Sequence, residues 1–207
     1  ALTTLFAGFF VGAIMSLQFT LQVQMFGALS YLGALVTSAT VREVGPLLIA
    51  FLLSGKIGAF TSAELGTMKV SEQIDAIRCL GADPIQEVIF PRFVGIVVAS
   101  FFLLSFGILF SFLGGILMAT QFSGLNWEQY LTHIPRVVTS FSLVSGGVKC
   151  FFFSLIIATL CTYRGYVVIG GAKEVGEGVV AAATQTMISL VFMDWLTSFV
   201  LERLYYG

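Results

Sequence analysis

Charged side chains are distributed along this chain in a way that separates it from soluble proteins. Residues 1–41 contain no Asp, Glu, Lys or Arg, and residues 93–127 contain none either. About 20 consecutive apolar residues are enough for a helix to cross the hydrocarbon layer of a bilayer. The pattern therefore predicts an integral membrane protein whose chain crosses the bilayer several times.

Apolar stretches of this kind occur five times in the sequence. They are too long and too uniformly apolar for the alternating strands of a membrane β-barrel, so helices are the expected form. The fold class predicted is an all-α integral membrane protein with five transmembrane helices, in a single domain over residues 1–207. The predicted spans cover residues 5–24, 44–65, 93–120, 139–162 and 179–201.

The composition excludes several classes of function. Charged residues make up 10% of the chain, against about 25% in soluble domains, and a net charge of −1 gives no reason to expect nucleic-acid binding. The only histidine, His133, stands alone, and neither a phosphate-binding loop nor a nucleophile with its base is visible. We therefore expect no catalytic residue, no metal site and no cofactor on this chain.

The Lys and Arg residues of the connecting segments predict the orientation in the membrane. Five lie in the segments that follow spans two and four, at positions 69, 78, 92, 164 and 173, and three lie on the other side, at positions 42, 136 and 203. Cytoplasmic loops carry the excess of positive charge. We therefore expect residues 66–92 and 163–178 in the cytoplasm and Gly207, at the C-terminus, outside.

Small residues form one broad side of the second span. Two adjoining rows recur every four positions: Gly55, Ala59 and Ala63, and Ser54, Gly58, Ser62 and Gly66. Rows of small residues let a second helix approach closely. This side is expected to be buried, either at the centre of the protein or in the contact between two copies.

The most polar segment, residues 69–87, predicts a short amphipathic helix between spans two and three. Ser71 is placed to cap this helix, with Glu72 in its first turn and Arg78 in its last, which is favourable to the helix dipole. Gly81 supplies a natural end. From the residues alone, such a helix either rests on the headgroup layer or docks in a groove of a soluble partner.

Ionisable residues within the spans are the sharpest functional signal, because each costs roughly 2.5–3.5 kcal/mol at mid-helix on insertion scales. Lys149 lies near the middle of span four, and Asp194 lies in the outer half of span five. Lys56 lies in the inner half of span two, whose outer end carries Arg42 and Glu43. Two interpretations stay open: a structural ion pair between Lys149 and Asp194, or a polar patch in a cavity for an amphiphile with a charged head.

Residues 42–84 resemble the signature of a known family. They read REVGPLLIAFLLSGKIGAFTSAELGTMKVSEQIDAIRCLGADP. The matching elements are Glu43-Val-Gly-Pro46, Gly55-Lys56-x-Gly58, Ala63-Glu64-Leu-Gly66, Glu72-Gln73-Ile-Asp75-Ala76 and Gly81-x-Asp83-Pro84. Weaker matches follow at Pro91-Arg92, Lys149, Gly170-Gly171-Ala172 and Asp194. Over nearly its whole length the chain thus resembles the MlaE/YrbE permease family, the membrane subunits of lipid-transporting ABC systems.

The resemblance implies a homodimer of five-span subunits in the bacterial inner membrane, with the C-terminus in the periplasm. It implies two cytoplasmic ABC ATPase subunits that hold the ATP and Mg²⁺, a periplasmic MCE-domain protein and often a small STAS-domain protein. The implied cargo is phospholipid, moved between inner and outer membranes to maintain outer-membrane asymmetry. Family members also carry an amphipathic N-terminal helix, which we expect upstream of Ala1 because the sequence does not begin with Met.

The resemblance also assigns roles to individual residues. Arg42, Glu43 and Lys149 match positions associated with the lipid cavity. Residues 71–80 match the coupling helix received by the ATPase, which favours docking over the headgroup layer. The coupling residues implied are Ser71, Glu72, Gln73, Asp75 and Arg78. The chain departs from the family where many members have a basic residue and then a basic or amide residue, because these positions are Glu177 and Ala181.

Two other functions fit parts of the sequence. One is a non-transporting membrane scaffold that anchors a partner protein. The other is an ion-coupled carrier of small solutes, for which paired broken helices from inverted repeats are expected, and no convincing internal repeat is visible. Neighbouring genes for a P-loop ATPase and an MCE protein would favour the permease over both.

Cysteine labelling tests the predicted orientation. In a background without the native cysteines, cysteines introduced at Gln86 and Ser123 are expected to react from opposite sides of the membrane, because the charge bias places Gln86 in the cytoplasm. The measurement is labelling by a membrane-impermeant maleimide in intact cells. Labelling at position 86 under these conditions would reverse the orientation.

Overall fold

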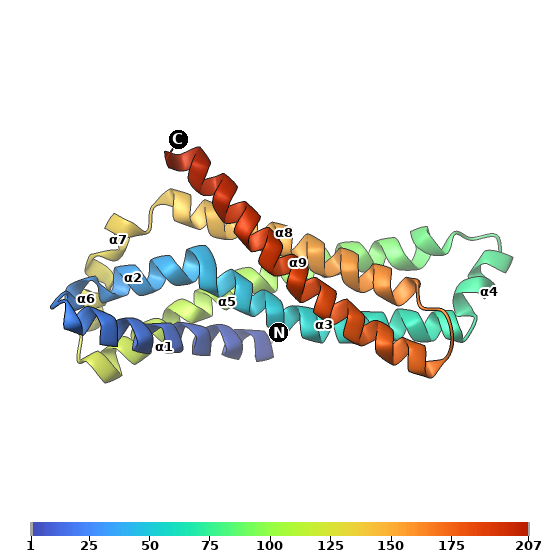
Figure 1. Cartoon of the computed structure of the whole chain (residues 1–207), viewed down its shortest axis with the longest axis horizontal. Helices are drawn as coiled ribbons and strands as arrows, with labels where there is room; N and C mark the ends of the chain where they lie inside the picture. The colour runs from blue at the N-terminus through green and yellow to red at the C-terminus, as the bar shows by residue number, and fades with distance from the viewer. Residues whose placement is uncertain (1, 207) are drawn as a thin grey trace. The chain divides into compact units, whose positions relative to one another are not determined.

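The computed structural model describes residues 2–206, and these are almost entirely helical (Figure 1). Gly207, which we expect outside the membrane, falls beyond the described residues. One 3₁₀ turn, η1 (Leu29–Tyr31), and two π-helical turns, η2 (Thr40–Val44) and η3 (Ile85–Ile89), lie between α-helices. The α-helices are α1 (Leu2–Met25), α2 (Leu32–Ala39), α3 (Gly45–Val70), α4 (Gln73–Cys79), α5 (Phe90–Ser123), α6 (Trp127–Thr132), α7 (Ile134–Val137), α8 (Ser140–Tyr166) and α9 (Ala172–Tyr206).

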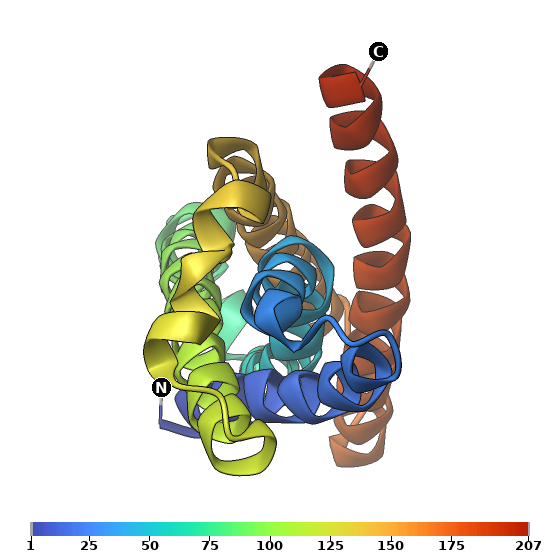
Figure 2. The ribbon, with the colours of Figure 1, turned by 90° about the vertical axis from the view of Figure 1, so that its left-hand side faces the viewer.

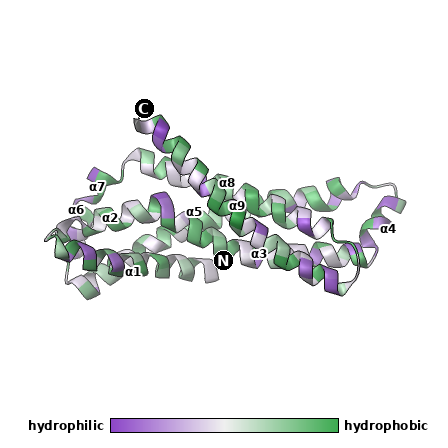
Figure 3. Ribbon diagram, viewed as in Figure 1, coloured by the Kyte–Doolittle hydropathy of each residue, from purple (hydrophilic) through white to green (hydrophobic). Residues whose placement is uncertain are grey.

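Five helical runs are long and apolar enough to cross a membrane, which confirms the predicted number of spans. They cover Leu2–Met25, Leu29–Val70, Ile85–Ser123, Ser140–Tyr166 and Ala172–Tyr205. In Figure 3 hydrophobic residues dominate α5, while hydrophilic residues gather at α4. The chain is therefore an all-α, multi-pass membrane protein.

The second run is much longer than the predicted span, residues 44–65. Gly27 takes a left-handed φ of +64°, which only glycine adopts easily, and α1 ends there in a tight turn. The next helical run therefore begins at Leu29. Arg42 and Glu43, which we expect at the outer end of this span, lie inside the continuous helical run rather than at its first residues. α9 likewise begins at Ala172 rather than at the predicted residue 179.

The chain forms two compact units, and α3, α5, α8 and α9 each contribute residues to both. Unit 1 comprises residues 2–49, 102–150 and 194–206. Unit 2 comprises residues 50–101 and 151–193. The single domain expected from the sequence stays a prediction.

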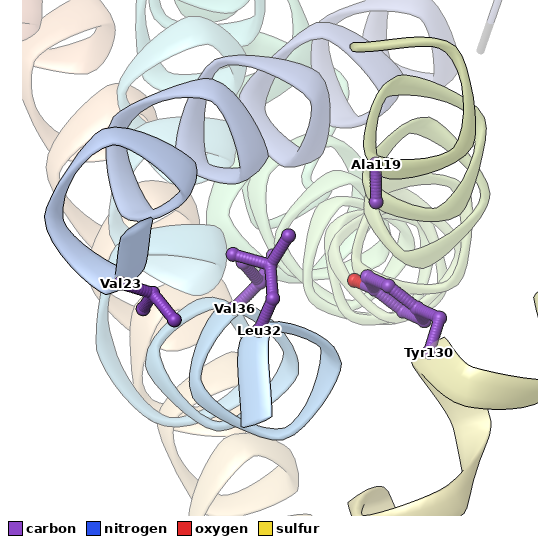
Figure 4. Close-up of a cluster of buried hydrophobic side chains, with 5 residues drawn as sticks. All are labelled: Val23, Leu32, Val36, Ala119 and Tyr130. Carbon is purple, nitrogen blue, oxygen red and sulfur yellow. The ribbon is translucent and has the colours of Figure 1, made fainter. Parts of the chain in front are cut away.

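The core of unit 1 forms around α2, which packs against α1, α6 and α7 (Figure 2). Figure 4 shows its buried cluster of Val23, Leu32, Val36, Ala119 and Tyr130. Tyr130 lies outside the five predicted spans, on α6, and it is 1% exposed. Burial raises the pKa of Tyr130 to about 12. The segment after α5 is therefore anchored to the core rather than free in solvent.

Small residues bring α1 and α5 into backbone contact in unit 1. Gly8 lies against the Gly107 carbonyl, Gly12 against the Ser111 carbonyl, and Gly114 against the Phe9 carbonyl, all closer than a Cβ atom would allow. Close approach of this kind lets dispersion and polar contacts act between helices that gain nothing from the hydrophobic effect in lipid.

The small-residue side of span two packs within unit 2. Ser54 and Ser62 are fully buried, and the Ser62 hydroxyl donates to the Cys161 carbonyl at 2.9 Å. Gly165 of α8 lies so close to Ser62 and Leu65 that a Cβ atom there would come within 2.9 Å of both. The expected burial is thus confirmed for the row of Ser54, Gly58, Ser62 and Gly66, whereas the Gly55, Ala59 and Ala63 row is only partly buried.

A methyl group at Gly12 tests the contact between α1 and α5. Gly12→Ala is expected to lower the free energy of unfolding by about 1–3 kcal/mol, because its Cβ atom would overlap the Ser111 carbonyl oxygen. Gly95→Ala is the matched control, since a Cβ atom there meets nothing within 4 Å. It is expected to raise stability by up to about 1 kcal/mol through helix propensity. Detergent-induced unfolding of both variants, followed by circular dichroism, gives the comparison. Equal stabilities would contradict the close packing.

Candidate functional site

Each of the two π-helical turns is followed, one residue later, by a proline. Pro46 follows η2 and Gly45, and Pro91 follows η3 and Phe90. Proline has no N–H to donate to the carbonyl four residues earlier, and its ring clashes with that carbonyl in a regular α-helix. Widening the preceding turn relieves the clash. Single π turns of this kind occur frequently at functional sites.

In η2 the widened turn is fixed by a backbone hydrogen bond. The Gly45 N–H donates to the Thr40 carbonyl, five residues earlier, and a Cβ atom at Gly45 would overlap that same carbonyl. The Thr40 hydroxyl donates to the Val36 carbonyl at 2.7 Å. The turn therefore requires the Gly45-Pro46 pair, and it presents the two charged residues that precede that pair, Arg42 and Glu43.

The Lys149 side chain of α8 is buried, with no exposed surface, among acceptors from η2 and α9. Its Nζ lies 2.5 Å from Glu43 Oε2, 2.7 Å from Ser198 Oγ and 2.8 Å from Asp194 Oδ1. The ammonium group donates hydrogen bonds to Glu43 and Ser198, and the contact with Asp194 is an ion pair. The structure thus contains the expected Lys149–Asp194 ion pair and adds Glu43 to it.

α9 supplies a polar row that faces η2 and α8. Asp194, Ser198 and Glu202 are spaced four residues apart and so share one side of the helix. The Glu202 carboxylate pairs with Arg42 at 3.1 Å, and the Arg42 guanidinium also lies 5.8 Å from the centre of the Phe141 ring. Tyr205 stacks on Phe141 at 4.2 Å. Arg42 and Lys149 therefore have different partners and different degrees of burial.

Most of the charged residues identified from the sequence come together in unit 1. Glu43, Lys149, Asp194 and Ser198 form one cluster and Arg42 pairs with Glu202; these two groups together are called the polar network below. Lys56 lies in unit 2, where it is exposed. Sequence reasoning missed Ser198 and Glu202. The signal was present, because both follow Asp194 at helical spacing. The pattern was overlooked because most of the residues between them are apolar.

α4 is held by ion pairs within unit 2. The Asp75 carboxylate lies 3.1 Å from Lys69 Nζ, at the end of α3, and 3.1 Å from Arg78 on α4 itself. Arg78 also donates to the Tyr166 hydroxyl at 2.6 Å, which connects α4 to the end of α8. A short helix with two such connections is oriented with respect to the helices that carry it.

The start of α4 differs from the prediction. The Ser71 hydroxyl donates to the Thr67 carbonyl at 2.7 Å and so continues α3 instead of capping α4. Glu72 occupies the N-cap position with a left-handed φ of +61°, because the chain reverses there. The helix therefore begins at Gln73, and Glu72 was wrongly placed in its first turn. Gly81, which has a left-handed φ of +80°, lies just after the end of α4, as expected.

Unit 1 also contains an apolar cavity of about 530 Å³. Its walls come from α2, η2, α5, α7 and α8 and include Val41, Ile108, Phe112, Gly146 and Cys150. Val41 precedes Arg42 in the chain, and Cys150 follows Lys149. Volumes of 300–1,000 Å³ with apolar walls are typical of small-molecule sites. An acyl chain matches this lining, since the walls offer few polar groups.

A buried, fully paired lysine inside a spanning helix is the central feature of the site, and comparison with known sequences supplies its context. Residues 1–200 match the permease MlaE family. This chain belongs to that family. A probable ABC transporter permease protein of Rickettsia conorii is 33% identical to it over 188 residues, which cover 91% of this chain and 73% of the relative. The family resemblance seen in residues 42–84 is thus confirmed.

Two further relatives of this family member have names that mention lipid. The intermembrane phospholipid transport system permease protein MlaE of Haemophilus influenzae is 28% identical over 211 residues, covering all of this chain and 78% of the relative. The chloroplastic protein TRIGALACTOSYLDIACYLGLYCEROL 1 of Arabidopsis thaliana is 32% identical over 193 residues, covering 91% of this chain and 54% of the relative. The match to the Haemophilus influenzae relative covers the whole chain and so includes the spans that carry the polar network.

Replacement of Lys149 tests the network. Lys149→Met is expected to lower the free energy of unfolding by about 3–5 kcal/mol, because it leaves two carboxylates without their counter-ion. Asp194→Asn is expected to restore only part of this loss, since Glu43 keeps its charge, and the further change Glu43→Gln should restore most of the rest. Detergent-induced unfolding measures all three variants. A stable Lys149→Met protein would show that the network does not depend on the ion pairs.

Proposed function

We propose that this chain is the permease subunit of an ATP-driven transporter that moves phospholipids between the inner and outer membranes of a bacterium. One observation carries the proposal. This chain, which belongs to the MlaE family, has a polar network in which the Lys149 ammonium group is buried and the Arg42 guanidinium group is more accessible. Polar groups inside spans are costly and usually serve function. A phospholipid has a charged headgroup and apolar chains, and the network and the apolar cavity of unit 1 offer surfaces for both.

The proposed assembly follows the family resemblance. Two copies of this chain form a homodimer in the inner membrane, with their C-termini in the periplasm. Two ABC ATPase subunits bind ATP and Mg²⁺ on the cytoplasmic side, so that this chain itself needs no catalytic residue or cofactor. An MCE-domain protein on the periplasmic side receives or delivers lipid, and a small STAS-domain protein is often part of such assemblies. The ABC transporter permease names of the relatives support the ATPase partner most directly.

α4 is the element that would receive the ATPase. Its connections through Lys69–Asp75 and Arg78–Tyr166 would pass a displacement of the helix to α3 and α8. Leu80, at its end, is 85% exposed and could contact a partner. A displacement of α4 by the ATPase would change how the spans pack. Such a change is needed because transport requires states of the protein that differ in their affinity for lipid.

The departures at Glu177 and Ala181 change the expected lipid contacts. In this chain the Glu177 carboxylate lies 3.7 Å from Lys173 on the same helix, and both side chains are well exposed. A basic residue at this place would attract a phosphate, whereas Glu177 repels it. Headgroup contact in this protein is therefore assigned to the network of unit 1 and not to the start of α9.

Reconstitution tests the proposed function. The chain is purified with its native partners, and the complex is placed in vesicles that contain a fluorescent phospholipid, next to acceptor vesicles without it. ATP-dependent transfer of the fluorescent lipid is expected, together with phospholipid among the co-purified molecules identified by mass spectrometry. A complex with an inactivated ATPase is the control. Hydrolysis of ATP without any movement of lipid would contradict the proposal.

Substitutions in α4 test the docking role. Glu72 is exposed and has no ion pair within residues 2–206, so Glu72→Lys with Leu80→Asp is expected to change stability by less than about 0.5 kcal/mol. The double variant should still lose most of its binding to the ATPase and most lipid-stimulated ATP hydrolysis. Asp75 is left unchanged, because reversing its charge would also break its two ion pairs. Glu128→Lys, at an exposed site on α6, is the control. Normal assembly by the double variant would rule out docking through α4.

A further inference from the structure

We infer that the network of unit 1 selects phospholipids with a zwitterionic headgroup, in which Arg42 binds the phosphate and Glu202 binds the ammonium group. The inference rests on the proposed function, because it names the class of lipid that the same site would take. It follows from which charges in the network are already paired, which are accessible, and what net charge they leave.

The two cations of the network are not equally available to a ligand. Lys149 already donates to Glu43 and Ser198 and forms an ion pair with Asp194, and its side chain has no exposed surface. The Arg42 side chain is 22% exposed, and its ion-pair partner Glu202 is 55% exposed. Ion pairs this accessible contribute little to stability, so they exchange readily for another ion. Arg42 is therefore the cation that an incoming phosphate meets.

Arg42 is also oriented for a phosphate. Guanidinium groups bind phosphate through two parallel N–H donors. The Phe141 ring lies 5.8 Å from this guanidinium, and Tyr205 stacks behind that ring at 4.2 Å. These aromatic contacts do not depend on Glu202, so Arg42 keeps its place when the carboxylate leaves. Phe141 lies at the start of α8 and Glu202 close to the end of α9, which places the pair near the end of both spans.

The net charge of the network decides between classes of headgroup. Two cations, Arg42 and Lys149, face three carboxylates, Glu43, Asp194 and Glu202, which gives a net charge of −1 when all are ionised. An anionic headgroup on Arg42 would leave Glu202 without a partner beside a new negative charge. A zwitterionic headgroup replaces the Arg42–Glu202 ion pair with two ion pairs, one between its phosphate and Arg42 and one between its ammonium group and Glu202. Every charge then keeps a partner.

Competition between two lipids tests the inference. The full chain in detergent is incubated with equimolar phosphatidylethanolamine and phosphatidylglycerol of identical acyl chains, and native mass spectrometry gives the ratio of bound lipids. The wild-type protein is expected to favour phosphatidylethanolamine by up to about fivefold, the most that one accessible ion pair supports. Glu202→Gln should bring the ratio close to one. Arg42→Gln should weaken both phospholipids and leave diacylglycerol, which has no phosphate, unchanged.

The controls separate this inference from the function on which it rests. Glu128→Gln removes an exposed carboxylate of unit 1 that pairs with no cation in the part of the chain that the structure describes, and it should leave the ratio unchanged. Glu202→Gln should unfold at the same temperature as this control, because its ion pair is accessible. A wild-type preference for phosphatidylglycerol, or a Glu202→Gln protein with the wild-type ratio, would overturn the inference alone. Failure of the wild-type protein to bind either phospholipid would overturn the proposed function as well.

Discussion

An ammonium group inside the hydrocarbon layer must be paired, and the arrangement of unit 1 follows from this constraint. An isolated ion there is too costly to persist, so Lys149 fixes the positions of its partners. Glu43 reaches it from η2, and Asp194 and Ser198 reach it from α9. Three helical segments that are distant in sequence are thereby connected at one point. Arg42 and Glu202 extend the same row toward the ends of the spans, where the charges are accessible.

The membrane class and the number of spans could be predicted because they depend on quantities that the sequence states directly, apolar length and the position of charge. The limits of the spans could not be predicted as well. The helical run that begins at Leu29 depends on the left-handed turn at Gly27, and glycines are too frequent in this chain for one of them to indicate a boundary. The burial of Tyr130 was missed for a similar reason, since it depends on packing against α2 and α5.

The residues of the candidate site could be predicted from the sequence better than the ion pairs between them. Arg42, Glu43, Lys149 and Asp194 were found because charge within spans is conspicuous. Their pairing required the three-dimensional structure, since Glu43 and Lys149 are 106 residues apart in the chain. Adjacent residues even have separate partners: Glu43 pairs with Lys149, whereas Arg42 pairs with Glu202. In α4 the residue types suggested a cap at Ser71, but the tertiary path of the chain placed that hydroxyl at the end of α3.

The π turn at η2 makes the second span sensitive to its length in a way that its helicity does not reveal. A π turn contains one residue more than an α turn, so the segments on either side differ in phase by about 100°. Loss of one residue between Thr40 and Val44 would remove the wide turn and rotate the segment on one side of it relative to the other. The buried side chains of Val36 and Ile49 would then no longer point into the same core, and the carboxylate of Glu43 would turn away from Lys149. Rotational register, rather than helix formation, is the property that this stretch of sequence preserves.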